Sequence, residues 1–179
     1  NFDPKKKLVL FACSNGLKDR RKGWDYLNSS LNMVKQKFDL VILGAKENIQ
    51  INKNFNGKIY WIEKINNDEQ LSNLYNSVDC LALPSRHDNS PLISLEAQCC
   101  GLPIVLFDCN GMSDLVDHKI SGFKAEAYNV EHFAEGIDWC IINSDQNILK
   151  KNILTKSKEQ NMKSIGIKYL KLYNKIIYK

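Results

Sequence analysis

Six short apolar runs alternate along the chain with stretches of helical periodicity. Each run is four to seven residues long and rich in aliphatic or aromatic side chains, which is typical of buried strands. Strands that alternate with helices predict an α/β domain, built on a parallel sheet with helices on both faces. The expected strands are residues 7–12, 39–44, 58–62, 79–84, 102–108 and 122–125.

Three of the stretches between or after these runs place apolar residues on one helical face. In a parallel sheet, ligands bind at the carboxyl ends of the strands, so the loops that enter the helices are where chemistry is expected. The predicted faces consist of Trp24, Leu27, Leu31 and Val34 in residues 24–34, of Leu71, Leu74, Tyr75 and Val78 in 68–78, and of Phe133, Ile137 and Cys140 or Ile141 in 131–142.

Length and charge favour one compact domain followed by a basic tail. With 179 residues, 44% of them hydrophobic, the chain can enclose a single sizeable core. The polar residues 143–147 mark the expected boundary, giving a domain of residues 1–146 and a helical tail of residues 147–179 that packs on the domain or on a missing lobe. Residues 150–179 carry a net charge of +8, so the remainder sums to −3. That distribution argues against a nucleic-acid partner.

The composition also restricts the cellular compartment and the cofactors. No apolar run approaches the length of a membrane span, and the first residues lack the features of a signal peptide; we expect the start to be a cut inside a longer protein. The six cysteines show no C-x-x-C spacing and the three histidines form no i,i+4 pair. We therefore expect no bound metal and a reducing, cytoplasmic location.

Residues 83–105 contain the best-defined helix of the chain. Ser90 followed by Pro91 is typical of a hydroxyl N-cap with proline in the first helical position. Gly101 and Pro103 then stop the helix. These start and stop signals predict a helix over residues 91–100.

Two carboxylates, Asp88 and Glu96, flank the N-terminus of this predicted helix. The free amides of Leu92 and Ile93 would present about half a positive charge there, which suits a phosphate. Two interpretations fit these residues. Either the acids belong to a binding site, or Asp88 complements the helix dipole while Glu96 is solvated. Because Glu96 lies among apolar residues in a helix between buried strands, we expect it to have a polar partner.

The sequence D-N-S-P-L-I-S-L-E-A-Q-C-C-G-L-P-I-V, residues 88–105, resembles the signature of the retaining glycosyltransferase family 4, which has the GT-B fold. Asp88 stands where the family usually has glutamate, and Glu96, Gly101, Pro103 and Val105 fall in place. The resemblance covers nearly the whole chain. Further matching segments are R-R-K-G (20–23), D-L-V-I-L-G (39–44), S-D-L-V-D-H-K-I-S-G-F (113–123) and K-Y-L-K-L-Y-N-K-I (168–176).

The resemblance implies a Rossmann-like C-terminal lobe of a GT-B enzyme, which binds a nucleotide sugar while an N-terminal lobe, absent here, binds the acceptor. By position, Glu96 would accept hydrogen bonds from the ribose hydroxyls and Asp88 would hold the donor sugar. Lys22 would contact the diphosphate together with the amides of Leu92 and Ile93. The family generally needs no divalent ion, and the chain has no D-x-D motif.

The sequence departs from the family at Gly16, where members often carry an arginine that binds the diphosphate. Lys18, Arg20 or Arg21 could replace it, the backbone of residues 14–16 could bind phosphate instead, or these basic residues are simply solvated. Pro91 also removes one amide that the usual glycine supplies. The expected catalytic residues are Asp88, Glu96 and Lys22, and the expected donor-binding residues are Ser14, Asn15, Gly16, Lys22, Ile62 and Ile65 (for the base), Ser90, Leu92, Ile93 and Glu96.

The tail places Ile165, Tyr169, Leu172 and Ile176 on one helical face with lysines elsewhere. In the family the last helix reaches back to the other lobe, so this face is either an interface with that lobe or a basic amphipathic surface that meets anionic lipid.

The resemblance favours a hexosyltransferase that takes sugar from a nucleotide sugar, which we expect to be UDP-linked. The acceptor is expected to be a glycan, lipid-linked at the inner face of the plasma membrane, in bacterial surface polysaccharide (O-antigen or capsule) synthesis. Alternatives are a sugar-nucleotide epimerase of similar fold and a non-catalytic nucleotide-sugar-binding subunit. We expect the fragment alone to bind nucleotide diphosphate without transferring sugar.

Overall fold

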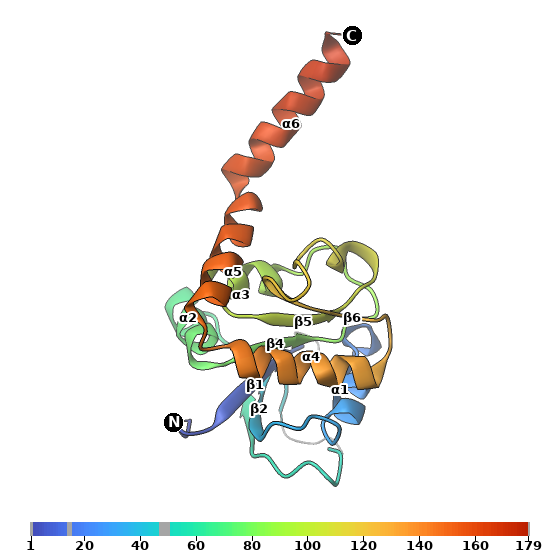
Figure 1. Ribbon diagram of the computed structural model, residues 1–179, viewed down its shortest axis with the longest axis vertical. Coiled ribbons are helices and arrows are strands. Elements are labelled where there is room, and N and C mark those ends of the chain that lie inside the picture. Colours follow the sequence, from blue (N-terminus) through green and yellow to red (C-terminus); the bar gives the residue numbers. More distant parts are fainter. Residues whose placement is uncertain (1, 14–15, 47–50, 179) are drawn as a thin grey trace.

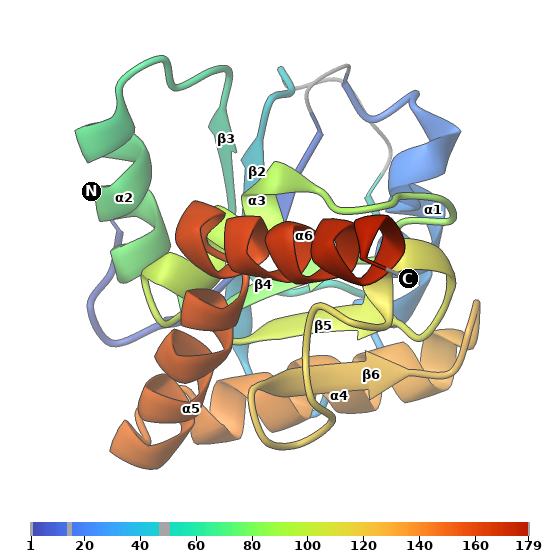
Figure 2. The same cartoon turned by 90° about the horizontal axis from the view of Figure 1, so that it is seen from above.

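The computed structural model describes residues 2–13, 16–46 and 51–178, and its centre is a six-stranded, wholly parallel sheet. The strand order is β3-β2-β1-β4-β5-β6. Figures 1 and 2 show the sheet from two sides. All six predicted strands are confirmed to within two residues at each end. They are β1 (Lys7–Ala12), β2 (Phe38–Leu43), β3 (Ile59–Ile62), β4 (Cys80–Leu83), β5 (Ile104–Phe107) and β6 (Gly122–Ala125).

Helices cover both faces of the sheet, as the alternation predicted (Figure 1). Helices α1 and α4 lie on one face, where α4 contacts β4, β5 and β6, while α2, α3 and α5 lie on the other. A 3-10 turn at Arg20–Lys22 precedes α1 and another at Asn110–Met112 follows β5. The helices are α1 (Trp24–Ser30), α2 (Asp68–Ser77), α3 (Leu92–Cys99), α4 (Val130–Asn143), α5 (Asn147–Glu159) and α6 (Met162–Ile177).

The core fills the space between the sheet and its helices. Every residue of β4 and β5 is buried, because a central parallel strand is covered on both faces. The predicted helical faces point inward: their buried members are Trp24, Leu27, Leu31, Leu74, Tyr75, Val78, Phe133, Ile137, Cys140 and Ile141, whereas Leu71 and Val34 are only partly buried.

The start of α3 differs from the prediction by one residue. Ser90 is not the N-cap: Pro91 occupies that position with an extended ψ of 122°, and the helix begins at Leu92. Instead, both the hydroxyl and the amide of Ser94 donate to the carbonyl of Pro91, at 2.7 and 2.9 Å. The predicted stop is confirmed, since Gly101 has a left-handed φ of 75° and its amide donates to Gln98 O.

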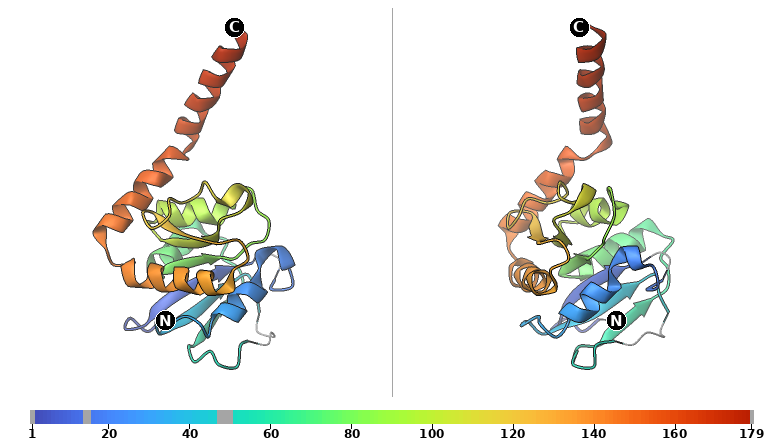
Figure 3. Two further views of the ribbon diagram at one scale, coloured as in Figure 1. Left: turned by 45° about the vertical axis from the view of Figure 1, so that its right-hand side comes forward. Right: turned by 90° about the vertical axis from the view of Figure 1, so that its right-hand side faces the viewer.

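The two helices of the tail behave differently. Helix α5 packs on α3 and buries Leu149 and Ile153. Helix α6 has no buried residue and projects away from the domain (Figure 3). None of the described helices is long and apolar enough to cross a membrane.

Candidate functional site

A pocket of about 770 Å³ opens at the carboxyl ends of the strands, beside the point between β1 and β4 where the strand order reverses. Open parallel sheets bind ligands at this place, because the loops on either side run to opposite faces of the sheet. Its lining consists of Ala12, Cys13, Arg21, Lys22, Leu43, Gly44, Ala45, Lys46, Glu63, Lys64, Ile65, Leu71, Tyr75, Asp88, Ser90, Pro91, Leu92, Ile93 and Glu96.

Lys22 reaches the pocket from the 3-10 turn before α1. The carboxylate of Asp19 caps this turn by accepting the amide of Arg21. Gly23 then adopts a left-handed φ of 68°, and a Cβ there would lie 1.8 Å from the carbonyl oxygen of Pro84. Only glycine allows this close approach between the two loops, and the approach fixes where Lys22 enters the pocket.

The ammonium of Lys22 forms an ion pair with Asp88 Oδ2 at 2.9 Å. The two side chains are only 17% and 19% exposed, and they come from the loops that follow β1 and β4. Partial burial strengthens such a pair relative to one in open water. A cation and an anion are thus held together at the mouth of the same pocket.

The N-terminus of α3 supplies hydrogen-bond donors next to this pair. The first amides of a helix have no acceptor within the helix, and those of Leu92 and Ile93 belong to residues that line the pocket. Pro91 has no N–H, and the amide of Ser94 is already bonded to Pro91 O. The helix therefore offers two amides to an anion, supported by the helix dipole.

Glu96 faces the same pocket from the second turn of α3. Its Oε2 accepts a hydrogen bond of 2.7 Å from the hydroxyl of Tyr75, which is buried in α2. The prediction that Glu96 has a polar partner is confirmed. Burial and then the bond to Glu96 raise the pKa of Tyr75 far above its ordinary value, so this hydroxyl remains a donor.

Arg86 ties the two loops of the ion pair together. Its guanidinium donates to the carbonyl of Arg20 at 2.6 Å, pairs with Asp25 through two hydrogen bonds and lies 4.4 Å from the ring centre of Tyr26. Its amide also donates to Arg21 O. Sequence reasoning missed both Arg86 and the hydroxyl of Tyr75; a tyrosine on an apolar helical face was a usable signal, because a buried hydroxyl needs a partner.

Most of the predicted site residues meet in this pocket. Lys22, Ile65, Asp88, Ser90, Leu92, Ile93 and Glu96 line it, whereas Gly16 and Ile62 do not. The amide of Gly16 donates to Cys13 O, and Ile62 O accepts the amide of Gly44. Both backbone groups are therefore already in use. Ser14 and Asn15 lie outside the described residues.

Of the three basic residues considered as replacements for the arginine absent at Gly16, Arg21 alone lines the pocket. Its guanidinium bonds to Asp19 at 2.8 Å, and its side chain is 57% exposed. Lys18 and Arg20 are exposed and do not contribute to the lining. Of these three candidates, Arg21 is thus the one that lines the pocket together with Lys22.

The pocket contains no reactive thiolate or metal-ligand cluster among the described residues. Burial raises the pKa of Cys13 to about 11, reinforced by Asp19 and opposed by Lys22, so the thiol stays protonated at neutral pH. Across residues 2–13, 16–46 and 51–178, no three His, Cys, Asp or Glu side chains gather in a way that could hold a metal ion.

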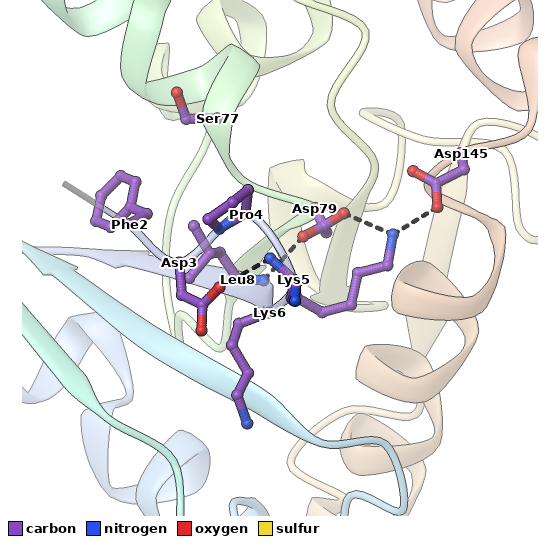
Figure 4. Close-up of a pocket in the computed structure, with 10 residues that line it drawn as sticks. Phe2, Asp3, Pro4, Lys5, Lys6, Leu8, Ser77, Asp79 and Asp145 are labelled. Atoms are coloured by element: carbon purple, nitrogen blue, oxygen red, sulfur yellow. Dashed lines mark hydrogen bonds and ion pairs between the residues drawn. The ribbon is translucent and has the colours of Figure 1, made fainter.

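A second pocket, of about 910 Å³, lies around the amino end of β1 (Figure 4). Here the ammonium of Lys7 donates to Asp79 at 2.9 Å, to Ser144 at 3.1 Å and to Asp145 at 2.6 Å. The other oxygen of Asp79 accepts the amide of Leu8. This network joins β1 to the residues before β4 and after α4, and its polar groups are bonded to one another.

Comparison with known proteins finds a matching family model and individual relatives. Residues 1–160 match the family model described as Glycosyl transferases group 1. The N,N'-diacetylbacillosaminyl-diphospho-undecaprenol alpha-1,3-N-acetylgalactosaminyltransferase of Campylobacter jejuni is 25% identical over 99% of this chain and 47% of that protein. The UDP-Gal:alpha-D-GlcNAc-diphosphoundecaprenol alpha-1,3-galactosyltransferase of Escherichia coli is 31% identical over 48% of this chain and 22% of that protein.

Solved structures have a similar fold. The sucrose-phosphate synthase of Thermosynechococcus elongatus superposes with a TM-score of 0.77 at 18% identity, over 99% of this chain and 47% of that chain. The predicted fold, a Rossmann-like parallel sheet as in the C-terminal lobe of GT-B glycosyltransferases, is confirmed. This chain spans less than half the length of the curated relatives it matches first.

Proposed function

This chain belongs to the family of glycosyl transferases group 1, and from that premise we propose that it is the donor-binding lobe of a retaining glycosyltransferase. The donor is a nucleotide diphosphate sugar, most readily a UDP-sugar, as the name of the Escherichia coli relative specifies for that enzyme. An N-terminal lobe outside this sequence would hold the acceptor and complete the active site.

The proposal rests chiefly on one observation: Lys22, Asp88 and the N-terminus of α3 surround the mouth of a pocket that also contains Glu96. An ammonium and two helix-terminal amides match a diphosphate. Asp88, beside them, can accept hydrogen bonds from sugar hydroxyls. Glu96, in the second turn of α3, can accept them from a ribose. From the loop before α3 into its second turn, Asp88, the helix amides and Glu96 follow one another as sugar, diphosphate and ribose do in a nucleotide sugar.

The same groups suit the chemistry of sugar transfer. When the bond between the sugar and the diphosphate breaks, negative charge develops on the departing phosphate. Lys22 and the amides of Leu92 and Ile93 are positioned by the fold before the reaction, so they can stabilise that charge without rearranging. Asp88 would orient the sugar. In this proposal the chain's own cations and amides serve the leaving group, and no metal is required.

The donor site can be tested by calorimetry with UDP, GDP and ADP. We expect UDP to bind most tightly, and Glu96→Ala and Lys22→Ala to weaken it by about tenfold or more, as loss of a charged hydrogen bond does. Lys37→Ala, an exposed lysine outside the pocket, serves as the control. Equal affinity in the parent and both site variants would remove the assignment.

For the acceptor, we propose a lipid-linked glycan used to build a bacterial surface polysaccharide such as O-antigen or capsule. Two relatives carry diphospho-undecaprenol acceptors in their names. Helix α6 supports a place at a membrane surface: its exposed apolar residues include Ile165, Tyr169 and Leu172, and it contains four lysines and no acid. Such a helix fits the interface of an anionic bilayer.

Vesicle sedimentation tests the membrane proposal. We expect vesicles with phosphatidylglycerol, but not pure phosphatidylcholine, to retain the protein, and Lys→Gln changes at positions 163, 168, 171 and 175 to abolish retention. The matched control changes Lys37, Lys53, Lys58 and Lys151, four exposed lysines outside α6. If the two quadruple variants behave alike, α6 does not bind lipid, and its apolar face is left to the N-terminal lobe.

A further inference from the structure

Tyr75 joins α2 to α3 through a single polar contact inside the candidate site. The residue is 3% exposed, and its hydroxyl donates to Glu96 Oε2 at 2.7 Å. We infer that Tyr75 is a positioning residue that orients Glu96 toward the ribose of the nucleotide, and that it thereby gives the site its preference for ribonucleotides over deoxyribonucleotides. The inference rests on the proposed donor site, and it names Tyr75 and Glu96 as the residues that recognise the ribose.

The geometry leaves one side of the Glu96 carboxylate for a ligand. Among the described residues, the bond from Tyr75 is the only hydrogen bond that the structure gives this carboxylate. Glu96 is exposed toward a pocket that both residues line. One oxygen is thus held by the protein, while the remaining acceptor capacity faces the space where a ribose with two neighbouring hydroxyls fits.

The hydroxyl of Tyr75 forms its hydrogen bond with Glu96 and not with a group of the core. The ring belongs to the hydrophobic core that also contains Leu74 and Val78, and phenylalanine has the same ring without the hydroxyl. A buried hydroxyl costs free energy unless it is bonded, and its partner here is a pocket carboxylate. Since burial and Glu96 keep the pKa of Tyr75 far above neutrality, the group acts as a donor at every working pH.

The hydrogen bond from Tyr75 holds the Glu96 carboxylate in place before a ligand binds. This should raise the affinity of the site for a ribose specifically. A free glutamate side chain loses rotamer freedom when a ligand orders it, and a hydrogen bond that already fixes the carboxylate removes much of that loss. A charge-assisted bond also directs the oxygen lone pairs more strictly than solvent does. Ligands without ribose hydroxyls gain nothing from this arrangement, which separates a positioning role from general stabilisation.

The test compares three ligands, UDP, 2′-deoxy-UDP and 2′,3′-dideoxy-UDP, on the parent chain, Tyr75→Phe and Glu96→Ala. We expect Tyr75→Phe to weaken UDP by about tenfold, the effect of one charged hydrogen bond, and to leave dideoxy-UDP unchanged. The ratio of UDP to dideoxy-UDP affinity should therefore collapse toward one, as in Glu96→Ala. Tyr60→Phe, on β3 and outside the pocket lining, should keep the parent ratio.

The outcomes separate this inference from the function on which it rests. If the parent binds UDP and Glu96→Ala weakens it, but Tyr75→Phe keeps the parent ratio, the positioning role is overturned and the donor site stands. If Tyr75→Phe weakens all three ligands equally, the hydroxyl acts through stability alone and the inference fails. If the parent binds none of the three nucleotides, the donor site fails and this inference falls with it.

Discussion

Two lysine–aspartate pairs lie at opposite ends of β1, and both have an N–O distance of 2.9 Å: Lys7–Asp79 near the amino end and Lys22–Asp88 beyond the carboxyl end. Lys7 has three acceptors, and Asp79 accepts a backbone amide with its other oxygen. Lys22 has one acceptor and stands beside helix amides. The amino-end pocket is the larger, at about 910 Å³ against about 770 Å³.

The two pockets differ in their free hydrogen-bonding capacity more than in their volume. Around Lys7 the polar groups form hydrogen bonds with one another, and these bonds hold β1 to the loops before β4 and after α4. Around Lys22 the pair leaves donors and acceptors that a ligand can use. Parallel sheets produce this asymmetry, because helix N-termini with free amides gather only where strands end and helices begin.

Gly23→Ala should destroy the carboxyl-end site together with much of the stability. The alanine Cβ would lie 1.8 Å from the carbonyl oxygen of Pro84, and the residue would have to keep a left-handed φ. The clash is with backbone atoms, so a side-chain rotation cannot relieve it. We expect a loss of at least about 3 kcal/mol in the free energy of unfolding, measured in urea. Gly166→Ala in α6, where a Cβ meets nothing within 4 Å, is the control and should be neutral or stabilising. A near-parental midpoint for Gly23→Ala would contradict this close approach.

Lys22→Met and Lys7→Met make the same change at the two pairs. Lys22→Met should weaken UDP binding by about thirtyfold, near 2 kcal/mol, because the diphosphate loses a cation and meets an unpaired Asp88. Lys7→Met should leave UDP affinity unchanged and lower stability by about 1 kcal/mol, since its acceptors lose one donor. Calorimetry and urea unfolding of both variants check this. Equal effects on UDP would erase the distinction between the pockets.

Asp88→Asn should have opposite effects on two ligands. Removing the charge frees Lys22 and reduces repulsion, so UDP alone should bind about threefold more tightly, in keeping with the modest strength of accessible ion pairs. The extra affinity contributed by the sugar of a UDP-sugar should fall, because Asp88 is its proposed partner. Competition calorimetry with both ligands measures the two effects. If both affinities fall, the pair does not restrain Lys22.

The smallest expected effect is a change in the free energy of unfolding at alkaline pH. Partial burial lowers the pKa of Lys7, but hydrogen bonds to Asp145 and Asp79 outweigh it, so the pKa stands above its ordinary value of 10.5. A raised pKa in the folded state means that the network stabilises the fold below pH 10.5, and that this stability disappears as the pH rises through the folded-state value. The stability difference between the parent and Lys7→Met should therefore be constant near neutral pH and shrink above pH 10.5. A difference that persists at higher pH would show that packing, not charge, is responsible.

The sequence predicted the sheet and the main helical faces because their signals are local. Apolar runs bounded by turns identify buried strands, and punctuation such as Gly101 ends a helix whatever surrounds it. The error at Ser90 is also local in origin. A serine before a proline fits an N-cap, but Pro91 took an extended ψ, and nothing in the sequence fixes that angle.

The site was predictable only where a motif specified it. Lys22, Asp88 and Glu96 were found through the resemblance to a family signature, and all three line the pocket. Arg86 and the hydroxyl of Tyr75 were missed, because their partners lie 61 and 21 positions away in the sequence. Contacts between loops depend on how the sheet brings strand ends together. The periodicity of apolar residues in the sequence does not encode these contacts between loops.

Helix α6 is formed by 16 residues that bury nothing against the domain. A helix of that length is only marginally stable by itself in water, and here the hydrogen bond from the Ser164 amide to Asn161 Oδ1 caps its N-terminus. Its backbone order is therefore conditional. Amide hydrogen exchange should be fast along residues 162–177 in the free chain and slow if another surface covers them, so the exchange rate of this helix would measure that contact directly.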